Sequence, residues 1–381
     1  MAGFQPRRAR ASSAIQSMKI AVNPTGNIEG LQVLRAIAAL MVVLHHARLS
    51  VPGSDAWPSF GEAGVDIFFV ISGFVMAYTT KLDDDLPMRG RFHAAGMFLR
   101  RRVIRVVPLY WLALLWTSRR ALAQGQVGSD LAKDFFFIPH PNSAFHTWLA
   151  PTLQQGWTLN YEAFFYLLFG VTLLFGSRRV ALLLGALAGC VIAGVVLAMA
   201  GWPADIDSAA GIARRFYGDN IILEFGYGVL LQRTMARAST RPGLPRWSFW
   251  LLAVLGFVAL ALGHGLGLRG VLEGLPAALI VWACIQLCAG RRMPVFELLG
   301  AASYSIYLFH WASFGAVKPL AAALGAMPNG PAKVTLLMAA HFAVAVIAGL
   351  AIHVAIEKPF TRWASRKFGG RTHKVPAVLS A

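Results

Sequence analysis

Long apolar runs separated by short polar segments make up most of this chain. The runs match the ~20 residues that an α-helix needs to cross the hydrocarbon core of a membrane. The pattern therefore predicts an all-α fold. We expect a polytopic integral membrane protein with about ten transmembrane helices in one bundle. We expect the ten spans close to residues 31–49, 61–80, 98–117, 157–176, 179–200, 218–233, 247–266, 269–289, 296–317 and 334–356.

Composition and charge agree with a membrane protein and give it an orientation. Hydrophobic residues make up 57% of the sequence, charged residues 14%, and the formal net charge is +18. The basic residues stand in short clusters between apolar runs, which is typical of cytoplasmic loops and not of a nucleic-acid surface. We therefore expect contact with membrane lipids, no nucleic-acid partner, and both termini in the cytoplasm. Four arginines in predicted external loops run against this distribution, namely Arg119, Arg120, Arg214 and Arg215.

Two basic tails should flank the membrane domain. We expect a cytoplasmic N-terminal tail at residues 1–30, with Met18 as an alternative start, and a cytoplasmic C-terminal tail at residues 364–381. The three cysteines all fall in predicted spans, where they are expected to be packing residues. The sequence has no Cys/His spacing typical of a metal site, no Walker A loop and no nucleophile elbow. No metal is therefore expected.

The first predicted span carries a charged residue near its start and a histidine pair near its end. Arg35 and His46 are eleven residues apart, so a helix places them on one face and roughly 16 Å apart along its axis. His45 points about 80° away from that face. A charge inside a membrane span is costly and often marks function. The alternative is that Arg35 only extends to the cytoplasmic surface, while His46 bonds a neighbouring helix.

Three more titratable residues fall in the external halves of predicted spans. Asp66 enters the second span, Glu162 lies about one and a half turns into the fourth, and His310 lies in the ninth. We expect all three at the depth of His46, where a buried carboxylate would need a partner. For Asp66 the alternative is a residue at a helix start that the helix dipole favours.

The third span begins with an arginine cluster. Arg102 and Arg105 are three residues apart and share a face at the cytoplasmic edge. Their forked guanidinium groups suit the recognition of phosphate. Ordinary anchoring at the cytoplasmic surface is the alternative, and it explains Arg105 less well because that residue lies a turn further into the span. Pro108 should kink this helix or mark where its regular hydrogen bonding begins.

Two further expectations concern packing. Residues 118–156 form the longest external loop, which is rich in aromatic residues and prolines, and either a lid or a re-entrant segment would suit it. Gly185 and Gly189 form a pair of small residues one helical turn apart. Such a pair predicts a close approach of two helices.

Six stretches, in this order along the chain, resemble the integral-membrane acyltransferases of acyltransferase family 3. They are LRAIAALMVVLHH, GVDIFFVISGF, RVIRVVPLYW, GWTLNYEAFFY, SYSIYLFH and EKPF. The family includes O-antigen, exopolysaccharide and nodulation-factor acetylases, and the start of this chain looks most like the exopolysaccharide-production branch. Two positions depart from the family pattern, because the family usually has a bulky apolar residue where His45 stands and often an acidic residue where Tyr161 stands.

The resemblance implies an acyltransferase membrane domain at residues 31–363. It implies transfer of an acetyl group from cytoplasmic acetyl-CoA to a hydroxyl group of an exopolysaccharide, an O-antigen or a lipid-linked glycan. It further implies a place in the bacterial inner membrane, with polysaccharide biosynthesis proteins as partners. On this basis Arg35, Arg102 and Arg105 are expected to hold the phosphates of acetyl-CoA at the inner edge of the membrane.

The catalytic group is expected nearer the outer edge. Histidine suits the removal of a proton from a hydroxyl near neutral pH, so we assign His46 as the general base, with a transient acyl carrier as the alternative. Asp66 and Glu162 are its expected orienting partners, and His310 is a fourth catalytic candidate. Two other classes of protein remain open. They are a transporter of glycans or small acids, which also uses intramembrane charges, and a structural partner of a polysaccharide synthase.

Overall fold

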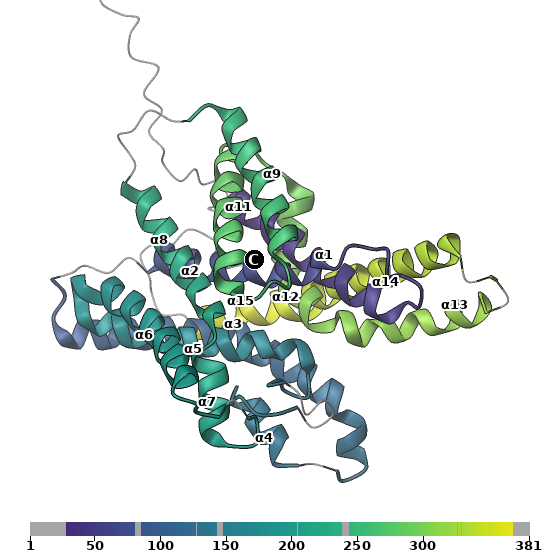
Figure 1. Ribbon diagram of the computed structural model, residues 1–381, viewed down its shortest axis with the longest axis horizontal. Coiled ribbons are helices and arrows are strands. Elements are labelled where there is room, and N and C mark those ends of the chain that lie inside the picture. The colour runs from purple at the N-terminus through teal and green to yellow at the C-terminus, as the bar shows by residue number, and fades with distance from the viewer. Residues whose placement is uncertain are drawn as a thin grey trace, which may run out of the picture.

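The computed structural model describes residues 28–368, except for 81–84, 127, 143–147, 204, 238–243, 326 and 329 (Figure 1). All the regular elements in these residues are helices, which confirms the all-α prediction. The longer ones are α1 (Glu29–Ser50), α2 (Gly64–Thr79), α3 (Met88–Ala123), α5 (Trp157–Thr172), α6 (Arg179–Met199), α8 (Leu223–Arg237), α9 (Arg246–Gly263), α11 (Gly274–Leu287), α12 (Pro294–Phe314) and α14 (Pro331–Ile352). The shorter ones are α4 (Ser129–Phe135), α7 (Ala209–Tyr217), α10 (Arg269–Leu272), α13 (Lys318–Ala323) and α15 (Lys358–Phe368).

Six helical segments of the described chain are long and apolar enough to cross a membrane. They are Glu29–Ser50, Phe60–Thr79, Gln154–Met199, Arg246–Gly263, Arg269–Leu287 and Pro331–Phe368. This finding supports a membrane protein and leaves the predicted count of ten spans unconfirmed. The predicted spans at 98–117, 218–233 and 296–317 overlap α3, α8 and α12, which are outside these six segments. The arginines of α3 and the 15-residue length of α8 make them weaker candidates.

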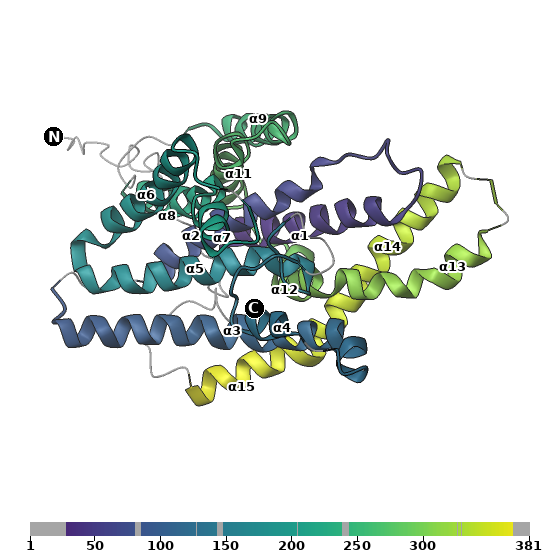
Figure 2. The ribbon, with the colours of Figure 1, turned by 60° about the horizontal axis from the view of Figure 1, so that its bottom comes forward.

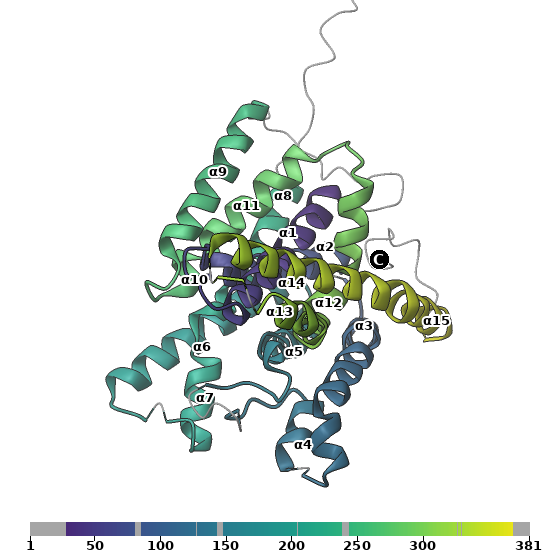
Figure 3. The ribbon, with the colours of Figure 1, turned by 90° about the vertical axis from the view of Figure 1, so that its right-hand side faces the viewer.

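Helix α1 lies in the middle of the bundle. It packs against α2, α11, α12 and α14, and these helices surround it in the end-on view (Figure 3). Its apolar residues are mostly buried. Glu29 in the first turn and Arg48 in the last have the charges that the helix dipole favours at those ends. Because α1 is one continuous helix, the Arg35-to-His46 spacing inferred from the sequence holds.

The closest helix contact in this core is between α2 and α8, at two glycines. A Cβ atom added at Gly73 would lie 2.0 Å from the carbonyl oxygen of Phe225, and one added at Gly228 would lie 2.0 Å from that of Val70. Only glycine therefore permits this approach. The glycine pair singled out in the sequence does not pack this way, because nothing lies within 4 Å of a Cβ atom built at Gly185 or Gly189.

Helix α3 forms a long strut along one side of the molecule, with α5 packed beside it (Figure 2). Pro108 lies inside this helix, which continues on both sides of it. Part of the long loop at 118–156 folds onto α3, where α4 is attached by Tyr110 and Trp111. The Tyr110 hydroxyl donates to the carbonyl of Asp134 at 3.1 Å, and the Trp111 indole donates to that of Phe135 at 3.0 Å.

The two predicted tails lie mostly outside the described residues, which begin at 28 and end at 368. At the C-terminal side, α14 passes through a short π-helix at His353–Glu357 into α15. Glu357 accepts hydrogen bonds there from Ser305 at 2.6 Å and from His353 at 2.8 Å. These bonds connect the end of α14 to α12, whose residues line the candidate site.

Candidate active site

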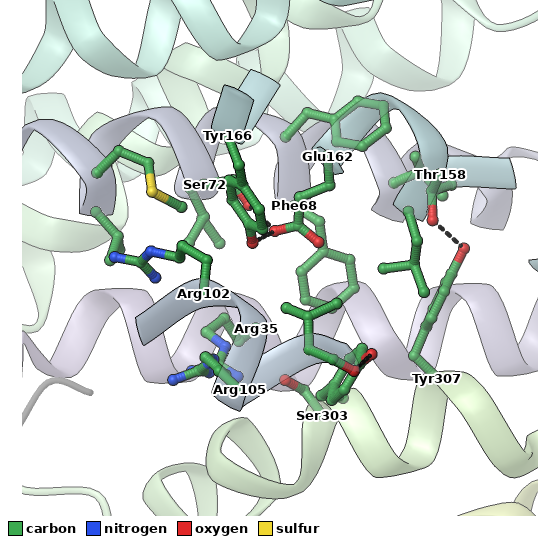
Figure 4. A pocket seen from close by; sticks show the side chains of 18 of the residues that line it. Arg35, Phe68, Ser72, Arg102, Arg105, Thr158, Glu162, Tyr166, Ser303 and Tyr307 are labelled. Carbon is green, nitrogen blue, oxygen red and sulfur yellow. Dashed lines mark hydrogen bonds between the residues drawn. The ribbon is translucent and has the colours of Figure 1, made fainter. Parts of the chain in front are cut away.

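A cavity open to solvent lies between α1, α2, α3, α5 and α12. Side chains from all five helices line it (Figure 4). Three arginines occupy one side, whereas Thr158 and Tyr307 meet at the opposite side, joined by a 2.9 Å hydrogen bond between their hydroxyl groups. The cavity therefore has a cationic end and a hydroxyl-lined end.

The cationic end contains the three arginines that the sequence analysis assigned to the donor. Arg35 comes from α1, and Arg102 and Arg105 come from α3. Arg102 is buried and donates to the Thr79 hydroxyl at 3.3 Å, while its Nε has no hydrogen-bond partner. Among the described residues, no carboxylate forms an ion pair with any of the three. Guanidinium groups inside the bundle that form no direct ion pair are suited to bind an anion.

Glu162 lies in this cavity and not beside the histidines. Its Oε1 accepts hydrogen bonds from the Ser72 hydroxyl at 3.1 Å and from the Tyr166 hydroxyl (Figure 4). The expectation that Glu162 contacts His46 is therefore wrong. The reason is the face of α5 on which Glu162 lies. That face meets Ser72 of α2 and Tyr166, whose hydroxyl groups bond the carboxylate.

His46 and His310 form a contact pair between α1 and α12. The His46 Nδ1 and the His310 Nε2 are 3.0 Å apart, and the two rings stack with centroids 4.8 Å apart. The other nitrogen of His310, Nδ1, is 2.7 Å from the carbonyl oxygen of Tyr307. These contacts unite two of the residues that the sequence analysis placed at the same depth.

The hydrogen bonds of this pair determine which nitrogen is free. The Tyr307 carbonyl can only accept, so Nδ1 of His310 carries its proton. A neutral His310 then accepts at Nε2, and His46 must donate from Nδ1. This arrangement leaves Nε2 of His46 with a free lone pair, as a general base requires.

His45 belongs to a different contact. Its Nδ1 lies 3.0 Å from the carbonyl oxygen of Ser59, in the segment between α1 and α2. Its ring is nearly perpendicular to that of His46, with centroids 5.2 Å apart. The structure thus separates the two adjacent histidines, as the helical spacing predicted.

Asp66 is fully buried, but it is bonded to Arg269 and not to His46. Its two oxygens accept from Nε and Nη2 of Arg269 at 2.9 Å each, while Nη1 of Arg269 donates to Glu62 at 2.6 Å. The expectation that Asp66 orients His46 is therefore wrong. The physical reason is that Arg269, which begins α10, supplies a charged partner with ideal forked geometry.

Three further residues of this region were not expected from the sequence, namely Arg269, Ser72 and Gln155. An arginine at the edge of an apolar run was the available signal for Arg269, and its partners are more than 200 positions away. Gln155 joins α5 to α12, because its side chain donates to the Leu308 carbonyl at 2.7 Å and its own carbonyl accepts from Tyr307 at 2.9 Å. No sequence signal indicated that role.

The two ends of the site lie along the same two helices. On α1, Arg35 lines the cavity and His46 lies about 16 Å further along. On α12, Tyr307 lines the cavity and His310 follows one turn later, with ring centroids 6.2 Å apart. Among the described residues, no group of three or more His, Cys, Asp or Glu side chains could hold a metal ion.

The fold and this site define a helical membrane protein with an open cationic cavity and a nearby pair of imidazoles. A family model described as an acyltransferase domain matches residues 28–357, and the chain belongs to that family. The protein is therefore an acyltransferase. No solved structure matches the chain significantly.

Relatives support this assignment. The chain is 32% identical over 333 residues to the exopolysaccharide production protein ExoZ of Rhizobium meliloti, an alignment of 84% of this chain and 94% of that protein. It is 25% identical over 355 residues to the acyltransferase MdmB of Streptomyces mycarofaciens, an alignment of 85% of this chain and 87% of that protein. A third relative, YrhL of Bacillus subtilis, has a name that proposes peptidoglycan O-acetyl transfer. It is 28% identical over 331 residues, which cover 74% of this chain and 48% of that protein.

Proposed function

We propose that this protein transfers an acetyl group from cytoplasmic acetyl-CoA to a hydroxyl group of a cell-surface or lipid-linked glycan, such as an exopolysaccharide or an O-antigen. We place it in the bacterial inner membrane with both termini in the cytoplasm. The observation that carries the proposal is the cavity that begins at three unneutralised arginines and ends next to a histidine pair. The family and its named relatives add support.

The arginine end fits the phosphates of the donor. Arg35, Arg102 and Arg105 would hold them, because no carboxylate of the described residues forms an ion pair with these cations and the Nε of Arg102 has no partner. When bound, acetyl-CoA supplies an acetyl group activated as a thioester. The 16 Å from Arg35 to His46 is on the order of the reach of a pantetheine arm.

The histidine end would handle the proton of the acceptor hydroxyl. In this proposal Nε2 of His46 takes that proton, because the other nitrogen donates to His310. As the hydroxyl oxygen bonds the acetyl carbon, the thioester C–S bond would break, and His46 would return the proton to the thiolate that leaves. His310 is held in turn by the Tyr307 carbonyl, so it fixes the tautomer and the ring orientation of His46. His310 thus takes the orienting role that the sequence analysis gave to Asp66 and Glu162. A transient acyl group on His46 remains the alternative route.

The test is acetyl transfer by purified variants in lipid. We expect His46→Ala to lower turnover by about 10²- to 10⁴-fold, which is the usual contribution of a general base. Acetyl-CoA binding should persist, because the arginines are untouched. His45→Ala is the matched control and should keep substantial activity, since His45 bonds the Ser59 carbonyl.

Four outcomes would reject the proposal or its site. Near-normal turnover by His46→Ala, or a dead His45→Ala variant, would overturn the assignment of the base. Surface glycans with unchanged acetyl content in cells that lack this protein would reject acetyl transfer to such glycans. A variant that loses transport of a glycan without any change in acetylation would favour the transporter class instead.

A further inference from the structure

A cationic groove lies beside the histidine pair, on the side away from the arginine cavity. Two adjoining hollows there share Thr117, Arg119, Trp311 and Ala312. We call them together the outer groove. Trp311 also contacts the catalytic pair, since its ring centroid is 5.1 Å from that of His46. The outer groove therefore shares a wall with the proposed general base.

Positive charge dominates the outer groove. Arg119, Arg120 and Lys318 line it, all three are exposed, and no Asp or Glu is among its described lining residues. None of the three forms an ion pair with another described residue. The Arg119 guanidinium lies over the Trp116 ring, 4.3 Å from its centroid. The groove thus combines unneutralised cations with the aromatic faces of Trp116 and Trp311.

The position of these cations is unusual for a membrane protein. Arg119 lies 17 residues beyond Arg102 on the continuous helix α3, which is about 26 Å along the axis. This distance is close to the ~30 Å thickness of a hydrocarbon core. With Arg102 at the cytoplasmic edge, Arg119 and Arg120 lie at the outer one, where basic residues are normally depleted. Membrane anchoring therefore does not explain them.

We infer that the outer groove binds a negatively charged acceptor glycan and presents its hydroxyl to His46. This inference rests on the proposed function and narrows its substrate class. Arginine pairs well with oxyanions, and the tryptophan rings offer flat apolar faces to sugar rings. The anion has two sources with the same chemistry, a carboxylate on the sugars or the diphosphate of a lipid carrier.

The test measures binding, so it does not depend on turnover. The probe is the set of oligosaccharides released from the surface glycan of cells lacking this protein, separated by anion exchange into charged and neutral fractions. Each fraction is titrated into the full chain in lipid nanodiscs, followed by tryptophan fluorescence. A second arm uses the charged fraction after chemical reduction of its carboxyl groups, and a third uses the neutral fraction linked to a polyprenyl diphosphate.

We expect the charged fraction to bind more tightly than the neutral one. The triple variant Arg119→Gln, Arg120→Gln, Lys318→Gln should lose roughly ten- to hundredfold in affinity for it. Arg215→Gln is the matched control, because Arg215 is also an exposed arginine of an expected external loop but does not line the groove. The control should bind as the parent does. Loss of affinity on carboxyl reduction assigns the anion to the sugars, whereas a gain in the third arm assigns it to the diphosphate.

Equal binding of the charged and neutral fractions overturns the inference, and so does an unaffected triple variant. The inference also fails if the triple variant binds the glycan normally but no longer enriches anionic lipids around itself in the nanodisc. The three cations would then bind lipid headgroups. Failure of the proposed function is a separate result. It would show as intact, charge-dependent binding with no acetyl transfer to either fraction.

Discussion

Two groups of arginines within the helical bundle have opposite surroundings. Arg269 uses all three of its nitrogens on carboxylates, two bonds to Asp66 and one to Glu62. The cavity arginines, Arg35, Arg102 and Arg105, have no carboxylate partner among the described residues, although they lie in the same bundle. Both groups hold positive charge where it is costly.

The difference separates a structural role from a binding role. A guanidinium whose three nitrogens each donate to a carboxylate connects helices, here α2 to α10, and its charge is already neutralised inside the protein. A guanidinium with a free Nε beside an open cavity can gain bonds only from a molecule that enters. Counting charges in spans would have treated the two groups alike.

The largest loss of stability should come from removing Arg269, the arginine whose charge is neutralised by carboxylates. Arg269→Ala leaves the carboxylate of Asp66 buried and unpaired, and such a loss costs about 3–5 kcal/mol. We expect a large fall in the thermal unfolding midpoint of the purified protein, with little change in acetyl-CoA affinity in the fraction that remains folded. The double variant Arg269→Ala, Asp66→Asn should recover part of the stability, since it removes the orphaned charge. An Arg269→Ala protein as stable as the parent would contradict the structural role.

The sequence predicted one of these arginine groups better than the other. Arg102 and Arg105 stand on adjacent turns of one helix, and Arg35 precedes His46 at a spacing that a single straight helix fixes. Local periodicity is enough to find such residues. The contact between His46 and His310 needed only that both lie at the same depth on neighbouring helices.

The partners of the carboxylates could not be found in this way. Asp66 and Arg269 are 203 positions apart, so their contact depends on how α2 and α10 pack and not on the pattern of either. The same holds for Gly73 and Gly228, whose fit depends on the opposite helix. The pair at Gly185 and Gly189 has the matching pattern but no neighbour. The spacing of residues along one helix follows from the sequence, whereas the rotation of that helix and the identity of its neighbours follow from packing.

Substitution of a cavity arginine should weaken acetyl-CoA binding, an effect smaller than the loss of stability expected for Arg269→Ala. Arg105→Lys keeps the charge but loses the forked geometry, so we expect acetyl-CoA to bind roughly ten- to hundredfold more weakly. Stability should change little, in contrast to the Arg269 variant. Arg101→Lys is the matched control, because Arg101 lies on the same helix but does not line the cavity. Titration of acetyl-CoA into each variant in lipid measures the difference. Unchanged affinity in both Arg102→Lys and Arg105→Lys would leave only an anchoring role for these residues.

The smallest effect concerns a third charged group, which lies outside the six candidate membrane spans, in the segment folded onto α3. His140 is 2.7 Å from Asp134, 2.8 Å from the Pro141 carbonyl and 3.9 Å from Asp130. Burial alone would lower the pKa of His140, but the bonds to Asp134 and the Pro141 carbonyl outweigh it, so the pKa lies above its ordinary value. A raised pKa in the folded state means that protonation stabilises the fold.

This stabilisation should be complete below the ordinary histidine pKa of about 6.5 and should vanish as the pH rises through the higher folded pKa. His140→Gln keeps a hydrogen-bond donor for Asp134 but does not titrate. We therefore expect the thermal unfolding midpoint of the parent to exceed that of His140→Gln at pH 5.5, and the difference to shrink by pH 8.5. Taking the difference between the two proteins at each pH cancels the titration of every other group. A difference that grows with pH would mean that neutral His140 is the stabilising form. The charge of His140 would then lack effective neutralisation by Asp134, unlike the charge of Arg269.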